Sequence, residues 1–260
     1  MPTRKKALDS RTRRVAVACV MLTLVIAGPR TARAQMPGMP EHIEMMSWGR
    51  TLFVLVDQLE YSPAGRGRPL NVEARAWYGG AYNRIWLRAQ SEQATTSREG
   101  EAEVELLYGK LVDPFWDAVI GVRVDRHWGD EDPGRILFGV GFLGLAPYRF
   151  ELEPTLFVSP RGEISARLEA GYQVLITQRL VAEPEFEVNA AVQRVPRFGV
   201  ARGINDFETG VRVRYEFRRE FAPYVGWSMS RRVGGSTNIA REHGEPVAEN
   251  RFVAGFRVWR

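Results

Sequence analysis

Hydrophobic and polar residues alternate along most of the chain after residue 50. In one stretch, Val72 and Ala74 share one face while Glu73 and Arg75 share the other. A period of two is typical of β-strands that present two different faces. Twelve segments show it, at residues 51–61, 70–78, 83–92, 101–110, 115–126, 135–143, 148–158, 163–175, 179–192, 204–217, 222–231 and 248–259. The pattern predicts an all-β fold of about twelve antiparallel strands, with ten or fourteen as alternatives.

The character of the two faces favours a membrane barrel over a soluble β-sandwich. Each segment is close to the roughly 9–11 residues that a tilted strand needs to cross a bilayer. The polar faces are charged along the whole strand, as at Glu183, Glu185 and Glu187, and the apolar faces end in aromatic residues, as at a membrane interface. These aromatic residues are Trp116, Tyr148, Tyr172, Tyr215 and Phe217. We therefore predict a transmembrane outer-membrane β-barrel at residues 51–260.

The connections between segments support the same prediction. Long connections such as 127–134 and 233–247 alternate with short ones, and a short connection after Val158 is the one exception. Outer-membrane barrels have short turns on the periplasmic side and longer loops outside. An even strand number then places both ends of the barrel in the periplasm. Because a proline cannot donate to the strand ladder, we expect local bulges at Pro154 and Pro184.

The first 34 residues resemble a secretory signal peptide. A basic start is followed by a short apolar run, Val15 to Ala27, and by a small-x-small cleavage site, Ala32-Arg33-Ala34. The alternative is a membrane anchor, but about 13 apolar residues fall short of the roughly 20 that span a bilayer. Cleavage after Ala34 would leave residues 35–50 as a short disordered periplasmic leader. We therefore expect an exported protein in the outer membrane of a Gram-negative cell.

Removing the signal changes the charge balance. The whole chain has 36 basic and 31 acidic residues, and the first 34 residues hold eight basic residues and one acidic residue. The remainder has 28 basic and 30 acidic residues, a net charge of −2. The basic balance of the chain is therefore no argument for nucleic-acid binding. Cys19 is the only cysteine and lies in the signal, so the exported protein has neither a disulfide nor a thiolate site.

Several segments resemble the copper resistance protein B family. They are VDQLE (56–60), RIWLR (84–88), ELLYGK (105–110), LGLAPYRFELEPTLFV (143–158), LITQRL (175–180), GINDFETGVRVRYEFRREFAPYVG (203–226) and RFVAGFRVW (251–259). The resemblance implies an outer-membrane barrel that binds or conducts copper ions in copper resistance and homeostasis, alongside periplasmic copper-resistance proteins. Copper would be its ligand or substrate and not a catalytic cofactor.

The leader contains the first candidate copper site. Copper(I) prefers thioether and thiolate ligands, and without cysteine the soft ligands must be methionines. Five candidate ligands fall within eleven residues: Met36, Met39, His42, Met45 and Met46. We interpret them as an open site that folds around the ion. A chance cluster in a disordered leader is the alternative.

The barrel lumen contains the second candidate metal site. Its acidic members are Glu151, Glu153, Glu169, Glu183, Glu185 and Glu187. Other predicted inward-facing residues are Glu73, Glu103, Glu105, Asp117, Asp206, Glu208, Arg75, Arg84, Arg88, Arg123, Arg149, Arg167, Arg212, Arg214 and Arg257. They could form cross-strand ion pairs that hold the barrel shut, or an acidic path that attracts cations. Both interpretations stay open.

Two other functions are alternatives. A barrel hydrolase of lipids or peptides would need a nucleophile and a base, but Ser228 and Ser230 lie in no G-x-S-x-G motif. We expect His127 and His243 to be solvated residues of outer loops, and we predict that the protein is not an enzyme. A structural barrel without metal function is the other alternative. We expect Val213 to face lipid, so that a charged substitution there destabilises the barrel. We expect Arg212 to face the lumen and to tolerate replacement by alanine.

Overall fold

The computed structural model describes residues 49–129 and 134–260, and most of these form β-strands. The strands are β1 (Thr51–Tyr61), β2 (Pro69–Gly79), β3 (Asn83–Ala94), β4 (Gly100–Asp113), β5 (Trp116–Trp128), β6 (Arg135–Ala146), β7 (Phe150–Val158), β8 (Ile164–Gly171), β9 (Val174–Leu175), β10 (Leu180–Ala191), β11 (Gly203–Tyr215), β12 (Phe221–Arg232) and β13 (Ala248–Trp259). The helical segments are η1 (Pro147–Arg149), η2 (Pro196–Phe198) and α2 (Gly235–Glu242). Within the described ranges, no helix is long and apolar enough to cross a membrane.

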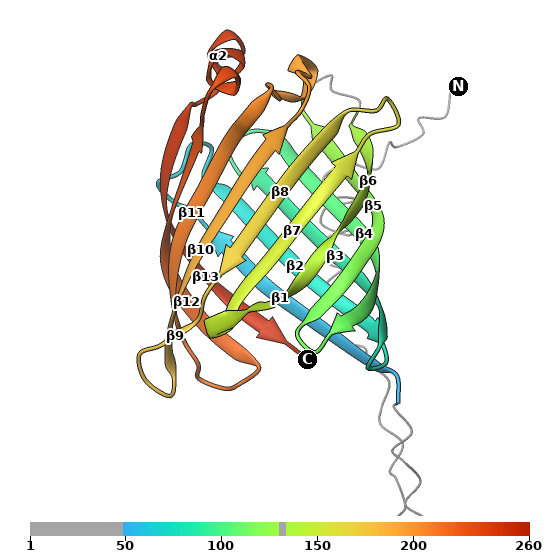
Figure 1. Cartoon of the computed structure of the whole chain (residues 1–260). Coiled ribbons are helices and arrows are strands. Elements are labelled where there is room, and N and C mark those ends of the chain that lie inside the picture. The colour runs from blue at the N-terminus through green and yellow to red at the C-terminus, as the bar shows by residue number, and fades with distance from the viewer. Residues whose placement is uncertain (1–48, 130–133) are drawn as a thin grey trace, which may run out of the picture. The chain divides into compact units, whose positions relative to one another are not determined.

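The strands form one closed antiparallel barrel (Figure 1). Consecutive strands pair along the chain, and β1 pairs with β13 to close the ring. The short β9 continues β8 along β10 in the same register. The two pieces therefore count as one, and the barrel has twelve strands. This confirms the predicted strand number, since the predicted segment 163–175 covers both pieces.

The connections differ in length between the two ends of the barrel. One end, called the loop end, carries residues 62–68, 95–99, 129, 134, 159–163, 192–202 and 233–247. The other end, called the turn end, carries residues 80–82, 114–115, 147–149, 176–179 and 216–220. The start of β1 and the C-terminus both lie at the turn end (Figure 1). The predicted alternation of loop lengths is therefore confirmed.

Side chains divide between the two faces as the alternation predicts. Ile120, Val140 and Leu156 lie next to one another on β5, β6 and β7, and more than half of each side chain is exposed. Glu105 and Asp117, by contrast, are buried inside the barrel. An apolar outer face suits contact with the hydrocarbon of a bilayer. The closed barrel suits it too, because hydrocarbon cannot form hydrogen bonds with unpaired backbone groups.

Aromatic pairs flank the turns at one end of the barrel. The rings of Phe150 and Tyr172 lie 4.7 Å apart, and those of Tyr215 and Phe217 lie 4.9 Å apart. Tyr148 is almost fully exposed at the neighbouring turn. These positions are consistent with an interfacial girdle at the turn end.

Two local expectations were wrong. The strands show no bulge at either proline. Pro184 lies opposite the break between β8 and β9, where its carbonyl oxygen accepts from the Tyr172 N–H at 3.1 Å, and Pro154 lies beside a gap in the β6–β7 pairing. Arg149 is not an inward-facing strand residue, because it belongs to η1 and is exposed. Tyr148 and Arg149 both have φ near +66°, a left-handed turn that a strand cannot continue through.

Candidate functional site

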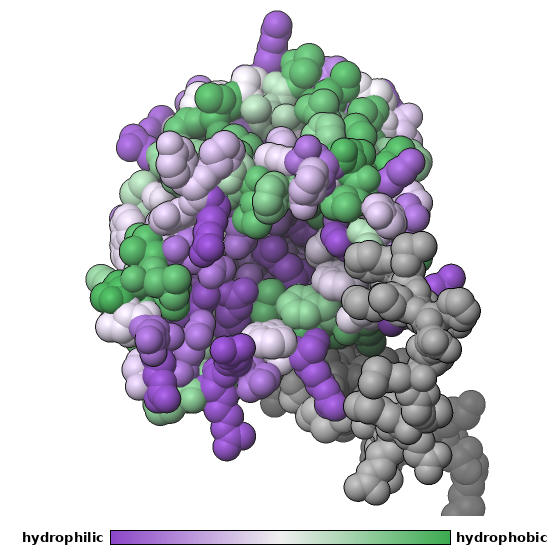
Figure 2. Space-filling view, turned by 60° about the horizontal axis from the view of Figure 1, so that its bottom comes forward, coloured by the Kyte–Doolittle hydropathy of each residue, from purple (hydrophilic) through white to green (hydrophobic). Residues whose placement is uncertain are grey.

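The lumen contains two cavities, each with many charged residues in its lining. The loop-end cavity has a volume of about 630 Å³, and the turn-end cavity about 360 Å³. Figure 2 shows the turn end, where hydrophilic residues lie in the hollow and hydrophobic residues lie on the outside. Strand periodicity explains this arrangement, because every second side chain points inward.

All six predicted lumen acids line the loop-end cavity. Glu151 and Glu153 also line the turn-end cavity. The structure therefore brings together the acids that the sequence assigned to the lumen. The leader residues Met36, Met39, His42, Met45 and Met46 lie outside the described residues, as does the signal segment 1–34.

Five of the six predicted acids form ion pairs with arginine. Glu153 and Glu169 contact Arg88 at 3.0 and 2.5 Å. Glu187 lies 3.3 Å from Arg167, while Glu183 pairs with Arg214 and Glu185 with Arg212. Glu151 instead accepts a hydrogen bond from Gln173 at 3.3 Å. The first interpretation, cross-strand pairing, therefore describes most of these carboxylates.

Several ion pairs of the lumen join strands that are not neighbours. Both nitrogens of the Arg167 fork on β8 contact Glu103 on β4, at 2.7 and 3.0 Å. Lysine occurs only at Lys5, Lys6 and Lys110, so the lumen uses guanidinium groups as its cations. A planar guanidinium donates in parallel to both oxygens of a carboxylate, which a lysine cannot do. Arginine therefore suits pairs that must hold a fixed geometry across a cavity.

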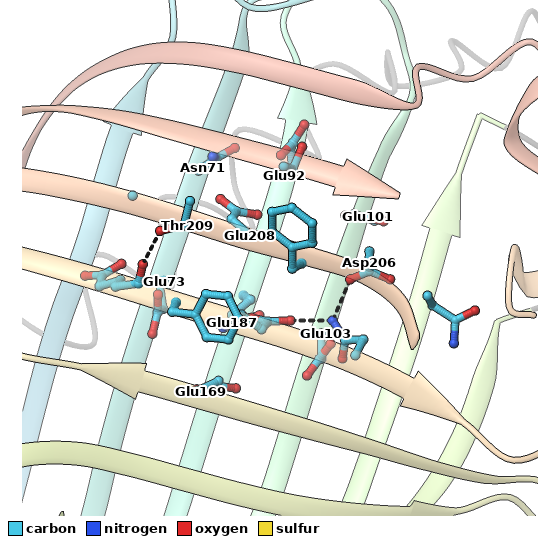
Figure 3. A pocket seen from close by; sticks show the side chains of 18 of the residues that line it. Asn71, Glu73, Glu92, Glu101, Glu103, Glu169, Glu187, Asp206, Glu208 and Thr209 are labelled. Atoms are coloured by element: carbon cyan, nitrogen blue, oxygen red, sulfur yellow. Dashed lines mark hydrogen bonds between the residues drawn. The ribbon is translucent and has the colours of Figure 1, made fainter. Parts of the chain in front are cut away.

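The loop-end cavity nevertheless has an excess of acid. Carboxylates outnumber guanidinium groups in its lining by more than two to one. Figure 3 shows Glu187, Asp206 and Glu208 on the same wall, with Glu187 and Asp206 bonded to one amide. That amide belongs to Asn189, at 2.7 and 2.8 Å. A carboxylate-rich, partly enclosed space attracts cations. The negative potentials of its carboxylates add, and the little water inside screens them weakly.

The described part of the lumen contains no preformed metal cluster. Nowhere in residues 49–129 and 134–260 do three or more His, Cys, Asp or Glu side chains come together as metal ligands. The acidic residues can attract a cation, but they do not form a closed coordination shell in this conformation.

Two of the three histidines lie among the described residues. His127 lies within β5 and not in a loop, and it lines the loop-end cavity 3.3 Å from Glu101. His243 follows α2, and its Nδ1 lies 2.8 Å from the carbonyl oxygen of Ile239. Ser228 and Ser230 both lie on β12. Neither of these histidine contacts is with a serine.

Six acids that line the loop-end cavity were not among the predicted inward-facing residues: Asp57, Glu60, Glu92, Glu101, Asp125 and Glu249. Asp57 and Glu60 lie on β1, where the register shifts between Val56 and Gln58 and the simple alternation is lost. Asp125 follows Arg123 on the inner face of β5, so its period-two position could have identified it. For Asp57 and Glu60 the pattern gave no signal, because apolar residues flank them on both faces.

Comparison with known proteins identified a family match and two similar proteins. A family model described as "Copper resistance protein B precursor (CopB)" matches residues 50–260. "Copper resistance protein B" of Escherichia coli is 42% identical over 206 residues, which cover 79% of this chain and 68% of that protein. "Copper resistance protein B homolog" of Pseudomonas syringae pv. tomato is 36% identical over 207 residues, covering 80% and 69%.

Among solved structures, a NanC porin has a similar fold. It superposes with a TM-score of 0.50 at 11% identity, and the match covers 81% of this chain and 100% of that one. At this identity the likeness concerns the barrel fold alone.

Proposed function

This chain belongs to the copper resistance protein B family, and we propose that it acts as an outer-membrane barrel that takes copper ions into its lumen. Family membership supports the role in copper resistance. The uptake of copper into the lumen is our proposal, and it rests on the acid excess of the loop-end cavity. Copper(II) accepts carboxylate and imidazole ligands, and both ligand types are present there.

The methionine-rich leader would act on the same ions at the periplasmic side. Thioethers favour copper(I), and loosely spaced ligands suit capture and transfer better than storage. Periplasmic copper-resistance proteins are the expected acceptors. In this proposal the protein binds and transfers ions and catalyses no reaction.

We expect the mature protein in the outer membrane, with heat-modifiable mobility on gels. The expectation rests on the signal-like residues 1–34 and on the apolar outer face of the barrel. A closed barrel resists detergent until it is heated, because all its strands are paired. Fractionation and paired heated and unheated gels would test this. Recovery of the mature chain in the soluble periplasmic fraction would contradict it.

Replacing Met36, Met39, Met45 and Met46 together with leucine is expected to lower bound copper(I) and leave the barrel folded. Leucine keeps the volume and hydrophobicity of methionine but removes the thioether ligand. The measurement is copper quantification on purified protein under reducing conditions. Zinc bound by the same sample is the control and should not change.

A parallel lumen variant separates the two candidate sites. Asp206→Asn with Glu208→Gln removes two charges from the loop-end cavity, and neither residue belongs to the ion pairs that cross the lumen. This variant is expected to bind less copper(II) and to keep its copper(I). If the leader variant keeps all its copper and the lumen variant loses it, the thioether hypothesis is wrong.

A further inference from the structure

One chain of ion pairs crosses the lumen from wall to wall. It runs through Glu169 on β8, Arg88 on β3, Glu153 on β7, Arg75 on β2, Asp57 on β1 and Arg257 on β13. We call these six residues the transverse chain. Acids and arginines alternate along it, so its net charge is zero. From Arg257 the pairing continues to Glu183 on β10, at 3.4 Å.

The central contacts of the transverse chain join opposite walls. In the ring of twelve strands, β2 and β7 are five positions apart, and Figure 1 shows β7 and β8 on the near wall with β2 and β3 behind them. Glu153 uses one carboxylate oxygen for each arginine, at 3.3 Å to Arg75 and 3.0 Å to Arg88. Side chains that meet from opposite walls occupy part of the cross-section of the lumen.

The transverse chain also lies where the two cavities meet. Arg75 and Glu153 line both the loop-end and the turn-end cavity. Arg88 lines the turn-end cavity, and Asp57 and Glu169 line the loop-end cavity. The transverse chain therefore lies between an acid-rich space on one side and a smaller space on the other.

We propose that the transverse chain closes the lumen to ions and that the Arg88–Glu153–Arg75 contacts are its central link. Each arginine is held by several carboxylates, since Arg75 also contacts Glu73 at 3.1 Å and Arg88 also contacts Glu105 at 3.5 Å. An ion that passes from one cavity to the other must separate Glu153 from at least one guanidinium. That copper is the ion that passes rests on the proposed function, but the closure of the lumen does not.

The test removes one link without changing the net charge. Arg75→Ala with Glu153→Ala deletes one cation and one anion from the transverse chain. The matched control is Arg197→Ala with Glu163→Ala, which deletes an ion pair of 3.2 Å in the loop-end connections. Each purified protein is inserted into planar lipid bilayers in potassium chloride, and single-channel conductance is recorded. Heat-modifiable mobility identifies the folded samples.

The Arg75/Glu153 variant is expected to conduct several-fold more than both the unaltered protein and the control. Its reversal potential in a salt gradient is expected to favour potassium over chloride, because the acid-rich loop-end cavity then becomes continuous with the other space. Equal conductance in the variant and the unaltered protein would overturn the proposal. If the double variant does not fold, Glu153→Gln weakens the same link with a smaller change, and its conductance decides in the same way.

The measurement also separates this proposal from the proposed function. The electrolyte contains no copper, so a failure of copper to bind would leave the conductance result unchanged. Conversely, equal conductance with and without the link would overturn the closure proposal but would not contradict copper binding by the lumen acids.

Discussion

Replacing Arg212 with alanine is expected to lower the free energy of unfolding by about 3–5 kcal/mol, because it leaves a buried carboxylate without its cation. Arg212 and Glu60 are 7% and 2% exposed. Two nitrogens of Arg212 contact the two oxygens of Glu60 at 3.1 and 3.0 Å. A further nitrogen pairs with Glu185. In the variant, the hydroxyl of Tyr224 would remain beside Glu60, at 3.1 Å, as a neutral donor.

The measurement is urea unfolding of the barrel in lipid vesicles, followed by tryptophan fluorescence. A second variant, Arg212→Ala with Glu60→Gln, is the control. It removes the unpaired charge and should recover part of the lost stability. A loss below about 1 kcal/mol in the single variant would mean that water reaches Glu60 and screens it as in a surface pair.

This result would reverse the expectation drawn from the sequence. Alternation correctly placed Arg212 on the inner face, and an inner-face arginine in a wet channel would tolerate alanine. The partner that makes it costly, Glu60, lies 152 positions earlier in the chain. No local pattern joins the two residues, because the ring closure between β13 and β1 brings their strands near one another.

Val140→Arg is expected to cost about 2–4 kcal/mol, the range for arginine on the lipid face near the bilayer midplane. Val140 lies at the centre of β6, between Ile120 on β5 and Leu156 on β7. Val140 tests contact with the hydrocarbon better than Val213 does. Val213 lies two residues from the end of β11, where an arginine side chain can extend to the membrane interface.

The same unfolding measurement applies, with Val140→Leu as the matched control that keeps the position apolar. The leucine variant should unfold within about 0.5 kcal/mol of the unaltered protein, as exposed conservative changes usually do. Equal stability of the arginine and leucine variants would show that this face does not contact hydrocarbon.

The fold was predictable because its main signal is local. Alternation within a strand depends on neighbouring residues alone, and the loop lengths need only the strand boundaries. The errors occurred where a second constraint acts. At Arg149 a left-handed turn makes β7 begin later than predicted, and at Asp57 a register shift hides the inner face.

The candidate site was predictable only in part, for a related reason. Inward positions such as Glu153 and Glu183 follow from strand periodicity. Their partners depend on which strands face each other across the ring, and this cannot be read from one strand at a time. The sequence therefore left pairing and cation attraction equally open, whereas the structure shows pairing at Glu153 together with acid excess in the loop-end cavity. The methionine site of the leader stays a prediction.

The seam between β1 and β13 has a consequence for the order of assembly. Every other junction joins strands that follow one another along the chain, so it can form as a local hairpin on the microsecond scale. The seam pairs Leu55 with Trp259, and its register slips between Val56 and Leu59. Contacts between such distant positions have the largest entropic cost of loop closure, and they therefore form slowly. We therefore expect β1 and β13 to join last during folding, and their amide hydrogens to exchange first when the barrel opens.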